Sequence, residues 1–101
     1  MTEECKPSAE IVRALSVVRT ALDRARSAHE RAYALHLEAA RLHDRAADFQ
    51  KLHADAERDL GRVENAQRME ALARGERELA CVERDLAAEQ HAALASLHVS
   101  R

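Results

Sequence analysis

A seven-residue repeat along residues 28–55 constrains the fold more than any other feature of this sequence. Seven residues make about two turns of an α-helix, so apolar residues at this spacing form a stripe along one helix face. Each of the four units begins with an apolar residue that is followed by a histidine or a glutamine. These residues are Ala28 and His29, Leu35 and His36, Leu42 and His43, and Phe49 and Gln50. The repeat predicts a long helix whose apolar stripe packs against another helix.

The composition agrees with long helices and excludes several fold classes. The chain has 101 residues with one Pro, two Gly, 2% aromatic residues and 34% charged residues. This length fits one small domain or one helical hairpin, and so few aromatic residues make a poor core for a compact globule. The net charge of -2 does not keep the chain unfolded by self-repulsion. We therefore expect an all-α fold and exclude a TIM barrel, a Rossmann domain and a β-sandwich.

A proline, a serine and a glycine indicate where the helices begin and end. Ser8 follows Pro7 and can cap the first N–H groups of a helix. Gly61 suits the left-handed residue that follows a helix end, whereas Gly75 is the rival position for the turn. The sequence thus predicts a long antiparallel helical hairpin with a coiled-coil-like, Ala-rich seam. The expected segments are a flexible tail over 1–7 and one helical domain over 8–101, with helices over about 8–59 and 63–97 and a turn near 60–62.

A break near Ser27 is the alternative, and it would convert the hairpin into a three-helix bundle. Ser27 and Glu30 have the spacing of a capping box, although no Gly or Pro supports a break there. Without the break, the first helix is longer than the second, so its N-terminal part extends past the end of its partner. The apolar residues of that part must then be covered by back-folding or by a second chain.

The heptads predict which residues form the seam of the hairpin. Leu35, Leu42 and Phe49 occupy d positions, and alanines at the a positions allow the helices to approach closely. One hairpin buries little large apolar surface, so we expect two hairpins to dimerise into a four-helix assembly. The predicted a-position alanines are Ala32, Ala39 and Ala46, and the second helix has Leu72, Leu79 and Leu86 with Ala66, Ala73, Ala80 and Ala87 alongside. The predicted interface residues are Ile11, Leu15, Val18, Leu22, Leu35, Leu42, Phe49, Leu72, Leu79 and Leu86.

Histidines at a spacing of seven line one edge of the predicted seam. Glu76, Glu83 and Gln90 recur at the same spacing on the second helix. With Gly61 at the centre of the turn, these three residues fall near Ala46, Ala39 and Ala32, between successive histidines. Pairing of His29, His36 and His43 with Glu76 and Glu83 would set the register and favour the antiparallel orientation, as charged residues beside the seam do in coiled coils.

A metal or haem site is the alternative interpretation of the histidines. A spacing of seven places the rings roughly 10 Å apart, which is too far for one ion, so donors from a neighbouring helix are needed. The candidate metal ligands are His36, His43, His53 and Glu57. We favour a structural interpretation, and we expect no cofactor.

Charge and cysteine usage bear on partners and location. Sixteen Lys and Arg and eighteen Asp and Glu are interspersed, and without a basic block we expect neither nucleic-acid nor membrane binding. The acidic start, which no long apolar segment follows, predicts no secretory signal and a cytoplasmic protein. Cys5 and Cys81 lack metal-type spacing, and Cys81 is expected to pack as a small apolar residue.

The sequence favours an interaction function over catalysis. No glycine-rich loop accompanies the candidate nucleophiles, and a hairpin has no enclosed pocket. We expect a small, non-enzymatic, self-associating helical protein that acts as an interaction or scaffold module. A homodimer is the expected form, with another helical protein as a further candidate partner. The alternative is a metal- or haem-binding bundle that uses the seam histidines.

Overall fold

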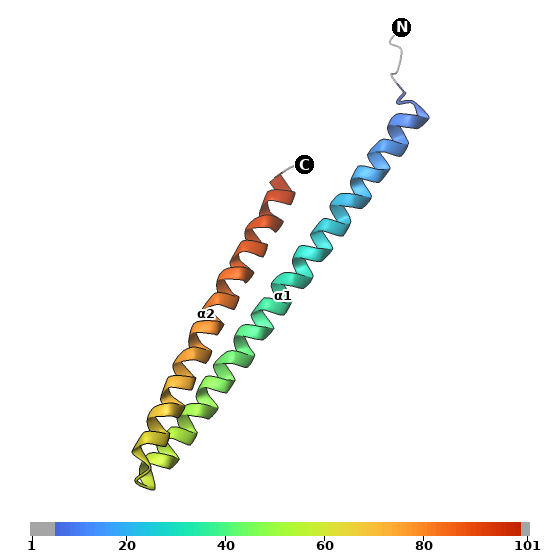
Figure 1. Ribbon diagram of the computed structural model, residues 1–101. Coiled ribbons are helices and arrows are strands. Elements are labelled where there is room, and N and C mark those ends of the chain that lie inside the picture. Colours follow the sequence, from blue (N-terminus) through green and yellow to red (C-terminus); the bar gives the residue numbers. More distant parts are fainter. Residues whose placement is uncertain (1–5, 100–101) are drawn as a thin grey trace.

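Two long antiparallel helices form a hairpin (Figure 1). The structure is a computed structural model that describes residues 6–99. Helix α1 spans Ala9–Asp59 and helix α2 spans Val63–Val99, and no strand occurs among the described residues. The Cα positions extend over 92 × 18 × 13 Å. The predicted all-α hairpin is therefore confirmed.

Helix α1 passes through Ser27 without a break, so the alternative three-helix bundle is wrong. The capping-box residues do not end the helix because Gly and Pro are absent from α1, and the helical hydrogen bonds continue. Of the predicted tail, only Lys6 and Pro7 lie among the described residues, where they precede α1 without regular structure.

Both ends of α1 are capped by the residues that the sequence singles out. The Ser8 side chain accepts a hydrogen bond of 3.2 Å from the Ile11 N–H, which satisfies one of the free donors of the first turn. At the other end, Gly61 has φ +76°, and its N–H donates to the carbonyl of Arg58. The Arg62 N–H donates to the Glu57 carbonyl, which completes a Schellman motif. The chain turns here because glycine adopts this conformation without steric cost.

The core of the hairpin consists of alanines. Among the described residues, the buried apolar ones are Ala40, Ala47 and Ala54 of α1 and Ala66, Ala73, Ala80 and Ala87 of α2. Alanine at each of these seam positions lets two helices approach closely, because its side chain adds only one methyl group. The expectation of an Ala-rich seam in α2 is met, but the large residues beside it do not share the burial.

The predicted seam of α1 is wrong by one helical position. Ala40 and Ala47 are buried instead of Ala39 and Ala46, and Leu42 remains 53% exposed. The heptads carry two adjacent stripes, one of Leu and Ala and one of Ala and His, and the second stripe faces α2. It does so because His and Glu side chains can pair across an alanine contact, which the leucine stripe cannot offer.

The register also differs from the predicted one by about one helical turn. Glu76 lies opposite His43 and Glu83 lies opposite His36, rather than between successive histidines. The prediction assumed that the loop is symmetric about Gly61. The Schellman motif makes the loop asymmetric, because α1 closes at Leu60 while Arg62 already accepts the first hydrogen bond of α2 from Ala66.

Candidate interaction surface

Three polar pairs cross the seam between the buried alanines. The Nδ1–H of His36 donates to Glu83 over 2.6 Å, and that of His43 donates to Glu76 over 2.6 Å. The third ring, His29, donates to Gln90 over 2.5 Å. Because a carboxylate or amide oxygen only accepts, each pair defines the ring nitrogen that carries the hydrogen. The predicted pairing with Glu76 and Glu83 is confirmed for His36 and His43, whereas His29 bonds to Gln90 instead of a glutamate.

These pairs are half-buried, which makes them suitable for setting register. The side chains of His36 and Glu83 are 28% and 23% exposed. A partly desolvated hydrogen-bonded pair costs more to break than an exposed ion pair, because slippage leaves polar atoms without partners. One heptad closer to the turn, the corresponding residue is Gln50, and its buried Oε1 atom has no hydrogen-bond partner. The set of polar pairs thus ends before the turn.

The structure does not bring the four metal candidates together. His36 and His43 bond to different glutamates, whereas His53 approaches Glu57 of its own helix at 3.7 Å. Across residues 6–99, no group of three His, Cys, Asp or Glu side chains could hold a metal ion. Successive seam histidines lie about two helical turns apart, so no two of them reach one ion.

One side of the seam carries ion pairs between the helices. Arg84 binds Asp44 over 2.5 Å, and Arg77 binds Asp48 over 3.2 Å. Arg58 and Glu70 form a third pair closer to the turn. These side chains are mostly exposed, so each pair stabilises the hairpin by at most about 1 kcal/mol. This side of the hairpin is therefore polar and already paired.

The other side of the seam is apolar. The ion-pair residues Asp44 and Arg84 each lie four residues after a buried alanine. The apolar residues Ala39 and Leu79 each lie one residue before a buried alanine. At about 100° per residue, these two positions lie on opposite sides of the seam. Residues two positions after a buried alanine, such as Leu42 and Val82, continue the apolar side outward. We name this surface the apolar flank: Ala32, Leu35, Ala39, Leu42, Ala46 and Phe49 of α1, with Leu72, Gly75, Leu79, Val82 and Leu86 of α2.

The large residues of the apolar flank are exposed. The exposed fraction is 69% for Leu35, 66% for Phe49 and 49% for Leu79. Isolated exposed leucines are common on soluble proteins, whereas a row of them along two helices is typical of an interaction surface. Leu86 is the one member of the predicted interface that is half-buried within the hairpin.

The N-terminal part of α1 extends beyond the end of α2 (Figure 1). We call residues 9–22 the projecting segment, and every residue of it is exposed. Its apolar residues continue the stripe of the apolar flank because they recur at the same helical spacing. The exposed fractions are 53% for Ile11, 51% for Val12, 59% for Leu15, 55% for Val18 and 40% for Leu22.

One expectation for α2 is wrong, and the rival turn position at Gly75 lies inside the helix. Cys81 is exposed rather than packed, because it lies one residue beyond the buried Ala80 and points outward. Gly75 does not touch another helix, since a Cβ atom added there would meet nothing within 4 Å. Its position on the apolar flank, between Leu72 and Leu79, was visible in the sequence, but the space around it was not. Cys5 lies outside the described residues.

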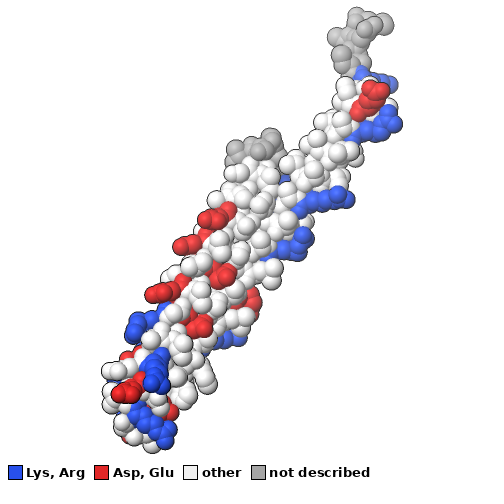
Figure 2. Space-filling view, in the orientation of Figure 1, with Lys and Arg blue, Asp and Glu red and all other residues white. Residues whose placement is uncertain are grey.

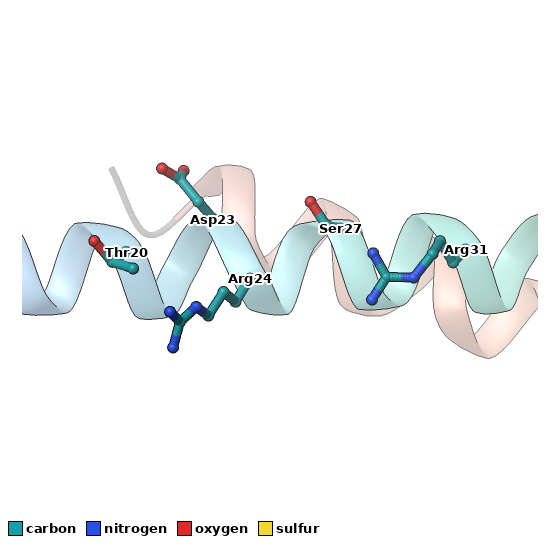
Figure 3. A pocket seen from close by; sticks show the side chains of 5 residues that line it. All are labelled: Thr20, Asp23, Arg24, Ser27 and Arg31. Atoms are coloured by element: carbon teal, nitrogen blue, oxygen red, sulfur yellow. The ribbon is translucent and has the colours of Figure 1, made fainter.

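The hollows on the molecular surface are shallow. The one in Figure 3 is lined by Thr20, Asp23, Arg24, Ser27 and Arg31, and all five side chains extend outward from α1. Such a surface has no second wall to surround a small molecule, as ligand sites do. The apolar flank and the projecting segment are therefore the leading candidates for a functional surface.

Comparison with models of protein families finds no match, and searches of curated proteins and solved structures find none either. Within the described residues, no helix is both long enough and apolar enough to cross a membrane. The chemistry and shape of the chain are thus the basis for proposing its function.

Proposed function

We propose that this protein is a non-enzymatic, self-associating helical module whose function is to form protein–protein contacts. Two copies pack through their apolar flanks and projecting segments into a four-helix assembly. The observation that carries the proposal is where large and small apolar side chains lie. Among the described residues, the seam buries alanines, while Leu42, Phe49 and Leu79 remain exposed. An interaction module needs this arrangement, because its large apolar residues must be available to a partner.

Energetics support association. Complete burial of one Leu, Val, Ile or Phe side chain contributes about 1.5–3 kcal/mol, whereas an alanine methyl contributes much less. The single hairpin leaves most of this free energy unused, while every ordered residue has an entropic cost. Packing two apolar flanks together covers the leucines of both helices in an antiparallel bundle.

A second copy of the chain is the partner that fits best. A two-fold contact requires a self-complementary surface, and the chain offers a long apolar stripe with opposite net charges at its two ends. Residues 9–26 contain four Arg and two acidic residues, whereas residues 27–99 contain fourteen Asp and Glu and ten Lys and Arg. In Figure 2, basic side chains line the projecting end of α1, and most acidic side chains in view lie over the two-helix part.

The proposal is tested by sedimentation equilibrium of the full chain at several concentrations. The wild type is expected to be a dimer that dissociates on dilution, and Leu35→Asp/Leu79→Asp is expected to be monomeric at the same concentrations. Each charged residue would otherwise be buried in an apolar contact. The matched control is Ala34→Asp/Ala71→Asp, which adds the same charge at exposed positions outside the apolar flank.

A monomeric wild type at all concentrations would overturn the proposal, as would a double variant as dimeric as its control. Circular dichroism of every sample reports helix content. The flank variant could lose helix content and also sediment as a monomer while the control remains a helical dimer. That result would show that folding and association are coupled, and it would also support the proposal.

A further inference from the structure

We propose that the two copies exchange their projecting segments. The projecting segment of each copy lies on the part of the apolar flank nearest the turn of the other copy. The two turns then lie at opposite ends of the dimer, and the two-fold axis passes near Ala28. This inference rests on the proposed self-association and adds its geometry.

The apolar arc of α1, meaning the sector around the helix axis that apolar side chains cover, is widest in the projecting segment. At the helical positions where the paired part of α1 has His29, His36 and His43, the projecting segment has Leu15 and Leu22. In the paired part these positions face α2 and bond to it. The pairing of His29 with Gln90 places Leu15 beyond the end of α2 and Leu22 beside its last turn. Both remain exposed, at 59% and 40%. Such an arc fits a surface made of two helices, not of one.

The two-helix surface that matches this arc is the apolar flank of a second copy. With the turns at opposite ends, the side of the projecting segment that carries Leu15 and Leu22 lies above α2 of the second copy. These leucines then meet Leu79 and Leu86 there. With the turns at the same end, the projecting segments extend past both α2 helices and contact only each other, so each meets one helix instead of two. Only the first arrangement offers a two-helix surface that covers Leu15 and Leu22.

Residue sizes along the stripe are also complementary about Ala28. On the N-terminal side of Ala28, Ile11 and Val18 occupy the positions that carry Ala46 and Ala39 on its C-terminal side. An antiparallel contact centred near Ala28 therefore places each large residue opposite an alanine of the other copy. In the same way, Leu42 and Leu35 lie opposite Ala14 and Ala21. Alternation of large and small residues lets the two surfaces interdigitate.

Gly75 provides a further observation. Glycine inside a helix costs roughly 0.5–1 kcal/mol relative to alanine, and nothing in the hairpin occupies the space beside Gly75. In the proposed dimer, the first turns of the projecting segment, around Val12, reach this position of the second copy. The missing side chain then allows a close helix contact.

Disulfide cross-linking between single-cysteine variants tests the arrangement. Cys5 and Cys81 are first replaced by Ser in the full chain. Val18→Cys and Ala39→Cys are then introduced separately, and the two variants are mixed in urea and refolded together. We expect the mixed pair to form a disulfide-linked dimer at least about tenfold faster than the mixture of Val17→Cys and Ala39→Cys, because proximity raises the effective concentration. Val17 is the matched control, since it is 69% exposed and lies outside the stripe.

The outcomes separate this inference from the proposed function. Rapid linkage of Val18→Cys to itself, without linkage to Ala39→Cys, would show the turns at the same end and overturn the inference, while self-association would stand. A cysteine-free chain that sediments as a monomer would overturn both. Equal rates for the Val17 and Val18 mixtures would also overturn the inference.

Energy transfer between turns is the second measurement. Donor and acceptor dyes are attached to Arg62→Cys in the cysteine-free chain. In the proposed dimer each turn lies about 50 Å from the axis, so the dyes are about 100 Å apart and transfer is nearly absent. Efficient transfer in a sample that sediments as a dimer would overturn the arrangement.

Discussion

The seam and the apolar flank of this hairpin reverse the usual distribution of residue size. The seam buries Ala40, Ala47 and Ala80, whereas the apolar flank exposes Leu42 and Leu79. Both surfaces run along the same two helices and repeat every seven residues. They differ in what faces them: the seam has a partner helix within the chain, and the flank has none among the described residues.

We infer from this difference that the two surfaces have separate roles. Alanines allow close approach but contribute little burial, and the polar pairs between them select one register. In the proposed dimer, the leucines contribute burial through contact with the second copy. The hairpin therefore obtains its geometry from the seam, and we infer that it obtains much of its stability from the flank.

Enlarging a seam residue should have the largest effect. Ala47→Leu forces three additional carbon atoms into a contact between helices, and we expect a loss of about 1–3 kcal/mol in the free energy of unfolding. The matched control is Ala71→Leu, which makes the same exchange at an exposed position and should change stability by less than about 0.5 kcal/mol. Urea denaturation at one fixed protein concentration measures both. An unchanged midpoint for Ala47→Leu would contradict the close alanine contact.

Breaking a polar pair of the seam should have the next largest effect. His36→Ala leaves the half-buried Glu83 without its donor, and we expect a loss of about 1 kcal/mol in the free energy of unfolding. Glu83→Gln should lose less than Glu83→Ala, because an amide oxygen can accept the same hydrogen bond, as Gln90 does from His29.

A double-mutant cycle on His36 and Glu83 separates their coupling from other effects. The matched control is the exposed pair of Glu38 and Arg41, whose closest N–O distance is 3.5 Å. We expect a coupling energy of about 0.5–1.5 kcal/mol for the seam pair and less than about 0.5 kcal/mol for the control. Equal coupling energies would mean that the seam pair contributes no more than a surface contact.

Removing the unpaired amide of the seam should have the smallest effect and the opposite sign. Gln50→Leu replaces a buried oxygen that has no hydrogen-bond partner, so we expect a gain of less than about 1 kcal/mol in the free energy of unfolding. Lys51→Leu, at an exposed position next to it, is the control. Stability that falls in Gln50→Leu would indicate that the Gln50 oxygen has a partner after all.

The sequence predicted the hairpin and the pairing partners of the histidines but not the face of α1 that meets α2. Ser8 and Gly61 signal the helix ends through local chemistry, which a sequence displays directly. The neighbouring stripes of Ala39 and Ala40 have the same period, and hydrophobicity favoured the one that includes the leucines. Only the opposite helix distinguishes them, because His36 needs Glu83 across the contact.

The sequence by itself determined the all-α class, the turn at Gly61 and a first helix longer than the second. These features follow from residues within one or two helical turns of each other, where backbone conformation and capping decide the outcome. The tertiary structure decided the buried alanines, the register and the exposure of Leu42 and Leu79. Those features depend on how two distant segments fit together, and side-chain size and polar pairing across the contact outweighed the hydrophobicity of either helix alone.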